Sequence, residues 1–368
     1  MQLEKTKIYG VDNVGGSSPT LVRTDSSVGL SYTVEASEIK SDFDSCYPFC
    51  EMREEVDGLG NVFIRIPKFY SKITPNANGT HKLQISGCRY DGFSTLFIDG
   101  QGNELDYVLV GKYEGSCDSS DYNTAKMKSV SGATVKVSIN ITNYRKACMN
   151  NGDGYQQYDF LIDAIIKQLF MIEFATTHSQ SIMTGWTNGS NTAALVTGHT
   201  DNVKTASGSW NNNHDAETDA WTDVTCNTDG YHACKYRGIE NPFGNTWTFV
   251  DGINFNNDKV FFCADPTHYE TSKYTAPYTY VGKRCMSNGY AKKITQFDKY
   301  PLLGYTSEIG ASGNTYYSDY YYTATTGVIL IVGGYWGNGV AGLWYWSGNL
   351  GAGVADGDFG GRLCYKPL

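Results

Sequence analysis

The sequence predicts an α+β fold that is irregular and rich in loops. Three observations predict it: one long amphipathic helix, several short strands of alternating hydrophobicity, and long polar connections between them. The chain has 368 residues, of which 40% are hydrophobic and 18% are charged. This composition is that of a globular protein with a substantial core.

The N-terminal half predicts mainly strands. Residues 1–45 are rich in Ser, Gly, Thr and Asp and predict a short β-rich segment with an assembly role. In NVFIRIPKFYSKI, Val62, Ile64 and Ile66 alternate with Phe63 and Arg65, which predicts a strand that turns or reaches an edge at Pro67. We expect further strands in TLFIDG, LDYVLVGKYEG and ATVKVSINI.

A helix is predicted in YDFLIDAIIKQLFMIEFATTHS. Its apolar residues form two rows with a period of 3.6, and together they predict a wide face that packs against a sheet. The GDG at 152–154 is a suitable breaker before this helix. Residues 187–229 are mostly polar and predict loops, and GVILIVGG predicts a final apolar strand that leads into residues 333–363.

Charge and motifs exclude several function classes. The net charge is −9, and residues 300–361 contain no Lys or Arg, which argues against nucleic acid as a ligand. We expect no membrane insertion, because no run of about 20 apolar residues is present, and no export signal, because the N-terminus lacks an apolar core. The ten cysteines include no CxxC pair, so buried free thiols are favoured over disulfides formed after release from the cell.

Other motifs are weak. GAGVADG at 351–357 lacks the third glycine and the βαβ context of a dinucleotide site. The acidic stretches DSSD and HDAETDAWTD leave a structural calcium ion open, although neither has EF-hand spacing. We predict no metal ligands and no other cofactor.

Three stretches resemble a known family. YRKACMNNGDGYQQYDFLIDAIIKQLFMIEFATTHSQSIMTGWT is similar to the helix region of the C-type lectin fold of the formylglycine-generating-enzyme type. GNTWTFVDG at 244–252 is similar to the Gly-Asn-x-Trp-x-x-x-Asp signature of that fold, and GGYW followed by GGRL is similar to its last strands.

The C-terminus is most similar to the variable proteins of diversity-generating retroelements, which include phage tropism determinants. SDFDSCYPFCEM and IPKFYSKI are also similar to these phage proteins. The resemblance covers roughly residues 40–368 and implies a C-type lectin-like domain over 46–368. It also implies a segment at 333–363 in which a reverse transcriptase rewrites adenines.

The resemblance divides the C-terminal segment into two sets. A scaffold would consist of Gly333, Gly334, Trp336, Trp344, Trp346, Gly360, Gly361 and Arg362, together with Trp247 and Asp251. A variable, ligand-binding set would consist of Tyr335, Gly337, Val340, Leu343, Tyr345, Ser347, Asn349, Leu350, Gly351, Asp356, Gly357 and Asp358.

The function that this resemblance implies is non-catalytic binding of a receptor. We expect a host-cell surface protein or glycan as ligand, a place in the tail of a phage or prophage, other tail components as partners, and a homotrimer or a monomer. An oxidase of the formylglycine-generating type is one alternative. Its cysteine pair has no counterpart, because the C-terminal part holds only Cys364, with Cys285 next upstream. A structural tail or baseplate component is the other alternative. ENP at 240–242 and WNN at 210–212 do not match the calcium-dependent sugar-binding triplets of lectins.

Overall fold

The fold is mostly β, so the predicted α+β class is wrong. The computed structural model describes residues 2–35, 38–117, 119–185, 187, 193–215, 220–223, 231–339 and 341–367. In these residues 25 strands form five sheets, whereas only two helices exceed one turn. The prediction was misled because polar and tyrosine-rich stretches that lack clear apolar alternation form strands, including part of 187–229.

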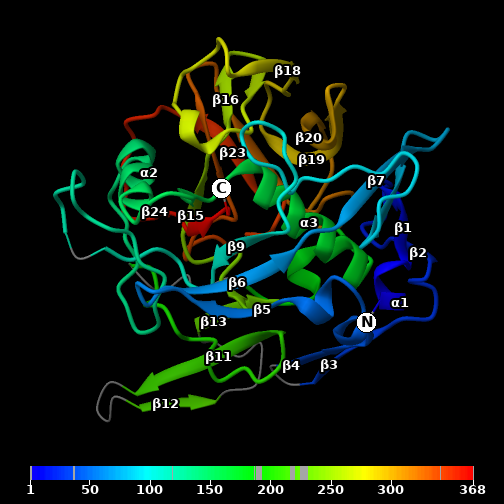
Figure 1. Ribbon diagram of the computed structural model, residues 1–368, viewed down its shortest axis with the longest axis horizontal. Helices are drawn as coiled ribbons and strands as arrows, with labels where there is room; N and C mark the ends of the chain where they lie inside the picture. Colours follow the sequence, from blue (N-terminus) through cyan, green and yellow to red (C-terminus); the bar gives the residue numbers. More distant parts are fainter. Residues whose placement is uncertain are drawn as a thin grey trace.

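Two sheets contain most of the N-terminal half (Figure 1). The first has the order β2-β1-β8-β7 and is antiparallel, with β1 Ile8–Val14, β2 Val22–Asp25, β7 Tyr70–Pro75 and β8 His81–Ser86. The second has the order β10-β25-β9-β6-β5, with β5 Arg53–Val56, β6 Val62–Pro67, β9 Tyr107–Gly111, β10 Tyr155–Gln157 and β25 Leu363–Tyr365. The last strand of the chain is therefore held between two early ones.

Three sheets contain the rest of the strands. One has the order β14-β13-β11-β4-β3, and β12 pairs with β11; its strands are β3 Tyr32–Glu35, β4 Glu38–Ser41, β11 Ser207–Asp215, β12 Ala220–Asp223, β13 Tyr231–Tyr236 and β14 Ile239–Glu240. A small sheet comprises β16 Ile253–Asn256, β17 Lys259–Phe262 and β18 Thr279–Lys283. The seven-stranded sheet has the order β20-β19-β21-β23-β22-β15-β24, with β15 Trp247–Val250, β19 Gly289–Phe297, β20 Tyr300–Ile309, β21 Tyr320–Thr323, β22 Ile329–Val332, β23 Trp346–Leu350 and β24 Phe359–Gly360.

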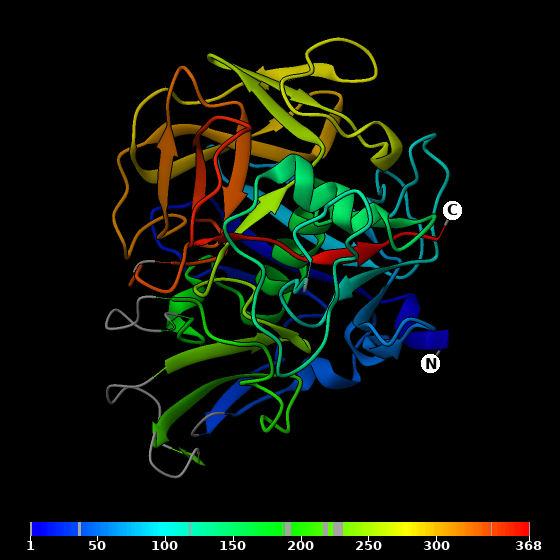
Figure 2. The same ribbon diagram turned by 90° about the vertical axis from the view of Figure 1, so that its left-hand side faces the viewer.

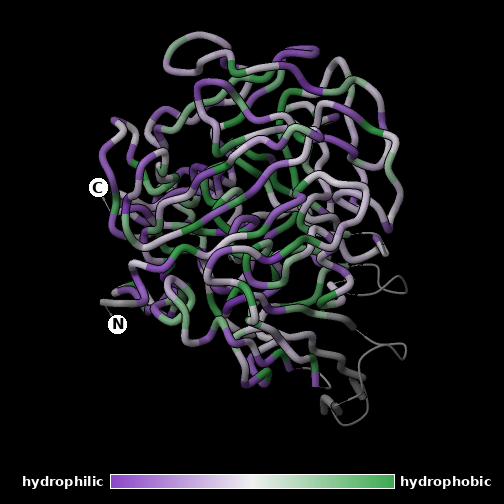
Figure 3. The backbone as a smooth tube through the Cα atoms, turned by 90° about the vertical axis from the view of Figure 1, so that its right-hand side faces the viewer, coloured by the Kyte–Doolittle hydropathy of each residue, from purple (hydrophilic) through white to green (hydrophobic). Residues whose placement is uncertain are grey.

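The predicted long helix is confirmed as α3, Phe160–Phe174, and it lies inside the molecule (Figure 1). The Asp159 side chain caps its N-terminus by accepting a hydrogen bond from the Ile162 amide at 2.9 Å. Every residue of α3 except Ala164 is buried. In Figure 3 the hydrophobic stretches of backbone, in green, lie mainly in the interior. The wide apolar surface of α3 thus supplies the centre of the main core.

The other predicted elements are confirmed in part. NVFIRIPKFYSKI forms β6 and β7, LDYVLVGKYEG contains β9, and GVILIVGG contains β22. TLFIDG and ATVKVSINI form only isolated bridges, so those two strand predictions are wrong. Ser138 has a positive φ of 55°, which breaks the second stretch, and Asn140 then caps a helix that the pattern did not predict, α2 Ile141–Met149.

A single helical turn, α1 Gln2–Lys5, begins the described chain. None of the helices described has the length and apolar character needed to cross a membrane. The acidic stretch HDAETDAWTD and the WNN triplet lie outside the residues whose side chains are described, as does Asp118 of DSSD.

Candidate ligand-binding face

Half-buried tyrosines lie along one face of β21 in the seven-stranded sheet. Along β21 the half-buried Tyr320 and Tyr322 alternate with the buried Tyr321 and Thr323, because successive side chains of a strand point to opposite faces. The Tyr320 ring centroid lies 5.2 Å from that of Tyr290 and 4.7 Å from that of Tyr322. These rings form a continuous aromatic surface beside the C-terminal segment.

We define the tyrosine face as Tyr290, Tyr320, Tyr322, Tyr335 and Leu350. All five are half-buried. All but Tyr290 pack on one hydrophobic cluster, which includes Phe249 and Ile331 on the same face of the sheet, and Tyr290 joins them through its contact with Tyr320. Strand β23 pairs in parallel with β21, which places Ser347 opposite Tyr322. The face therefore combines residues of β19 and β21 with residues of the predicted variable segment.

The first part of the segment is fixed by its backbone. Gly333 and Gly334 have φ values of 91° and 73°, a conformation that side-chain-bearing residues rarely adopt. A Cβ on Gly334 would lie 2.7 Å from the Cβ of Ala341. The Gly333 carbonyl accepts a hydrogen bond from the Gly244 amide at 3.0 Å, and the Trp336 amide donates to the Asn245 carbonyl at 2.9 Å. Residues 333–336 are thus attached to the GNTW motif.

Two of the three tryptophans of the segment lie in the core. Trp344 and Trp346 are each 3% exposed. The Trp346 ring stacks on Tyr305 at 4.7 Å with an interplanar angle of 11°, and the Lys167 ammonium lies 4.3 Å from its centroid. The Trp344 amide donates to a carboxylate oxygen of Asp319 at 2.7 Å. Trp336 differs from them, because it is half-buried and lies edge-on to Tyr335 at 5.3 Å.

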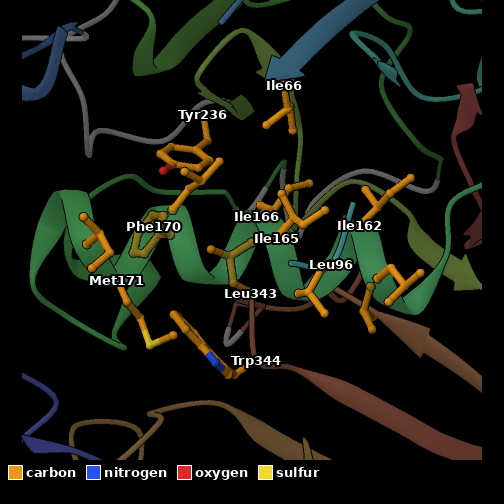
Figure 4. Close-up of a cluster of buried hydrophobic side chains, with 14 of the residues drawn as sticks. Ile66, Leu96, Ile162, Ile165, Ile166, Phe170, Met171, Tyr236, Leu343 and Trp344 are labelled. Carbon is orange, nitrogen blue, oxygen red and sulfur yellow. The ribbon is translucent and has the colours of Figure 1, made fainter. Parts of the chain in front are cut away.

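Three positions of the predicted variable set are buried. Leu343 is 5% exposed and lies beside α3 with Trp344, as Figure 4 shows. Tyr345 is 1% exposed, with its ring 4.7 Å from Trp247 and its hydroxyl accepting from the Asn338 amide group at 2.8 Å. Ser347 is 3% exposed and donates to Asn349 at 2.6 Å. A ligand that approaches from solvent would not reach these three side chains, because the fold uses them to fill space under the segment.

The other members of the variable set are accessible. Asp356 and Gly357 are exposed, and the half-buried members are Tyr335, Gly337, Asn349, Leu350, Gly351 and Asp358. Val340 lies outside the described residues. The structure therefore separates the eleven described positions of this set by exposure, which the sequence pattern alone did not do.

The end of the segment is attached through a buried arginine. Arg362 is 2% exposed, and its guanidinium donates to four backbone carbonyls, those of Gly111, Lys112, Glu240 and Asn241, at 2.6–3.0 Å. The Gly361 carbonyl accepts from the Gly115 amide at 2.9 Å. Gly360 and Gly361 are buried, and a Cβ on Gly361 would lie 2.9 Å from the Tyr144 ring. Figure 2 shows the last residues, in red, crossing from the seven-stranded sheet toward the C-terminus.

The GNTWTFVDG motif lies directly under this attachment. Trp247 is 6% exposed and packs on Tyr345, whereas the Asp251 carboxylate receives two hydrogen bonds from Arg145, at 2.8 and 2.5 Å. Glu114 is also buried and accepts from the side-chain amides of Asn241 and Asn245 and from both the amide and the hydroxyl of Thr246. Burial raises the pKa of the Glu114 carboxyl, and the nearby Arg362 opposes this rise. These contacts make a rigid polar base for β15 and β24.

The charge on the accessible surface of the segment is negative. Its charged side chains before Arg362 are those of Asp356 and Asp358, and burial raises the pKa of Asp358. Asp358 Oδ1 is a buried atom that has no hydrogen-bond partner among the described residues. Combined with the tyrosine rings, the exposed Asp356 gives the segment aromatic surface and acceptor oxygens for a ligand.

Sequence reasoning missed Tyr290, Tyr320 and Tyr322. The stretch TYYSDYYYT could have indicated a tyrosine-rich strand, but its unbroken YYY does not show which tyrosines face the core, and Tyr290 lies outside it. It also missed Asp319, because nothing in the sequence pattern indicates that this carboxylate accepts a hydrogen bond from the Trp344 amide.

The thiols and acidic groups do not form a recognisable reactive centre in the described part of the chain. There, no group of three or more His, Cys, Asp or Glu side chains could hold a metal ion. The nine described cysteines are free. Cys364 is fully buried, and burial raises the pKa of its thiol to about 12, whereas Cys285 is half-buried.

Comparisons with known proteins give a distant likeness to solved structures. No protein family and no curated protein matches the chain. Among solved structures, the chain is similar to a protein described as "Major Tropism Determinant U1 Variant", with 10% sequence identity and a TM-score of 0.29. The match covers 98% of this chain and 72% of that chain.

Proposed function

We propose that this protein is a non-catalytic receptor-binding protein of a phage or prophage tail, and that retroelement mutagenesis diversifies its C-terminal segment. The observation that carries the proposal is the division of residues 333–363 into a buried frame and an accessible face. The three sequence resemblances, in the helix region, in GNTWTFVDG and in GGYW followed by GGRL, support the same function. The ligand is a protein or glycan on the surface of a host cell.

The contacts of the segment suit such a role. Trp344, Trp346 and Arg362 are held by the core, so substitutions at accessible positions would leave the backbone in place. Tyr335 and Leu350 contribute large apolar surface at the accessible side, and tyrosine is enriched in binding sites because it brings much contact area for few rotatable bonds. Diversification would act on Tyr335, Gly337, Val340, Asn349, Leu350, Gly351, Asp356, Gly357 and Asp358.

The tyrosines of β21 would be constant members of the same face. Tyr320 and Tyr322 lie outside the segment that the resemblance marks as variable. The ring centroid of Tyr322 lies 6.0 Å from that of the buried Tyr345. We propose that they supply a fixed aromatic platform beside the changing positions. Homotrimer formation and contacts with other tail components belong to this proposal, and no cofactor is part of it.

An oxidase of the formylglycine-generating type is less well supported. A reactive cysteine needs an accessible thiolate. Burial of Cys364 and its raised pKa oppose that chemistry. The structural tail component remains the alternative that the binding test below must exclude.

The test is a cell-binding assay with the fluorescently labelled protein and a panel of bacterial strains. We expect Tyr322→Ala combined with Tyr335→Ala to lower binding to the recognised strain by more than about 30-fold, because central tyrosines commonly contribute about 2 kcal/mol or more. Tyr280→Ala is the matched control, since Tyr280 is 49% exposed and lies on β18.

Two results would contradict receptor binding. One is equal binding by the double variant and the Tyr280→Ala control, both with unchanged melting temperatures. The other is a lack of binding to every strain that the parent phage infects, which would favour the structural tail component.

A further inference from the structure

A second site lies away from the tyrosine face, between α3, the first sheet and the β19–β20 hairpin. A cavity of about 70 Å³ borders α3 and has Trp344 and Trp346 in its wall. An outer cavity of about 120 Å³ is bordered by Gly79, Lys293 and Thr295, all of which are exposed. The two cavities share five lining residues, namely Val14, His81, Ile294, Gln296 and Tyr317. The two cavities therefore adjoin, and we refer to them together as the passage, whose inner part borders α3.

His81 lines both parts of this passage. It is 8% exposed, and in the described part of the chain no hydrogen bond to its ring is present. Burial lowers the pKa of His81 to about 4, so the imidazole is neutral near pH 7 and carries one donor and one acceptor nitrogen. A ligand in these cavities that supplies both an acceptor and a donor would therefore pair with both ring nitrogens.

The inner end of the passage carries a neutralised ion pair. Lys167 and Asp163 bond to each other, with side-chain exposures of 6% and 4%. The Lys167 ammonium also lies over the Trp346 ring at 4.3 Å. A charged ligand would be buried here without a free counter-charge, and burial of an unpaired charge is strongly unfavourable. An uncharged ligand avoids this cost.

The remaining walls set the size and polarity of the ligand. Ile73, Met171 and Leu302 provide apolar surface, and Gln168 and Gln296 provide amide groups. An apolar cavity of about 150 Å³ is known to hold benzene, so the inner cavity is suited to a molecule of about three carbons, with room for more atoms in the outer one.

We propose that this passage binds a short uncharged polyol, of the size of glycerol or erythritol, whose hydroxyl groups pair with His81 and Gln296. Hydroxyls donate and accept together, which matches the neutral imidazole and the amide. The CH groups of the polyol would lie against the apolar walls and the tryptophan rings. The site is independent of the receptor-binding face, although its inner wall includes part of the frame under the C-terminal segment.

Saturation-transfer NMR of the intact protein tests the proposal, with glycerol and erythritol as probes. 1-Butanol, acetate and ethylammonium serve as apolar, anionic and cationic comparison probes. A binding spectrum is preferable to a melting curve, because polyols at high concentration stabilise proteins without occupying a site. The variants are His81→Phe and Gln296→Leu, with His268→Phe as the matched control because the His268 side chain is 58% exposed.

We expect polyol signals in the parent protein and in His268→Phe, with about tenfold weaker binding in the other two variants, since each loses a buried hydrogen bond to the ligand. If His81→Phe fails to fold, the loss of polyol binding in Gln296→Leu alone tests the proposal. Equal signals in all variants, or no polyol signal in the parent protein, would overturn the proposal. Preferential binding of 1-butanol, acetate or ethylammonium would overturn the assignment of an uncharged polyol.

Discussion

Arg362 gives the sharpest prediction about the frame under the binding face. Its guanidinium donates to four carbonyls that belong to two separate stretches, 111–112 and 240–241. Arg362→Met keeps much of the apolar stem but removes all four donors. Four hydrogen bonds of roughly 1 kcal/mol each give a loss of about 4 kcal/mol in the free energy of unfolding.

The assay is urea unfolding at 25 °C, followed by tryptophan fluorescence, on Arg362→Met, Arg362→Lys and a control. Lysine keeps the charge but cannot reproduce the planar fork of donors, so we expect an intermediate loss of about 2 kcal/mol. Arg53→Met is the control, because its side chain is 57% exposed and, within the described residues, pairs only with Glu55. We expect a loss below about 1 kcal/mol. A loss in Arg362→Met no larger than in the control would refute the role of Arg362 as an anchor.

Three further predictions concern packing, backbone and pH. Tyr345→Ala should lower the free energy of unfolding, measured in urea, by about 3–5 kcal/mol, because the Tyr345 ring is buried against Trp247. Tyr322→Ala should lower it by clearly less, and a similar loss would mean that Tyr322 is also a core residue. Gly334→Ala should lower the melting temperature because of its positive φ and the 2.7 Å approach to Ala341, whereas Gly353→Ala, with open space around it, should not; equal melting temperatures would contradict this. Burial raises the pKa of Asp319 to about 8, so the folded state keeps a proton that the unfolded state releases between pH 4 and 8, and stability should fall as pH rises through that window. Asp319→Asn should flatten this decline by at least about 1 kcal/mol, and a pH profile as steep as that of the parent protein would contradict the assignment.

The sequence predicted the parts of the fold that have a strong local period. Helix α3 has apolar residues on nearly all sides, and β6, β9 and β22 are short apolar runs, so periodicity was sufficient for them. It failed for ATVKVSINI, where alternation is present but Ser138 leaves the extended conformation and α2 begins at Ile141. It also failed for the fold class, because strands such as β11 and β21 are polar or tyrosine-rich and depend on partners far along the chain.

The candidate site was predicted as a segment but not as a surface. The resemblance predicted a set of variable residues, and it could not tell Tyr335 from Tyr345, which have the same side chain in the same segment. Tertiary packing separates them, because Tyr345 lies against Trp247 while Tyr335 is half-buried. The same limit applies to Leu343. In the sequence it has no feature that marks it as a core residue, whereas in the structure it is buried and packs beside α3.

The most direct measurement is the sequence of this locus in sibling isolates, together with the DNA around it. The account predicts substitutions concentrated at accessible positions such as Tyr335, Gly337, Asp356 and Gly357, constancy at Trp344, Trp346 and Arg362, and a near-copy of the 333–363 coding sequence, differing chiefly at adenines, beside a reverse-transcriptase gene. An invariant segment without such a copy, or variation as frequent at the buried tryptophans as at the accessible positions, would contradict the claim that this segment is a diversified binding face.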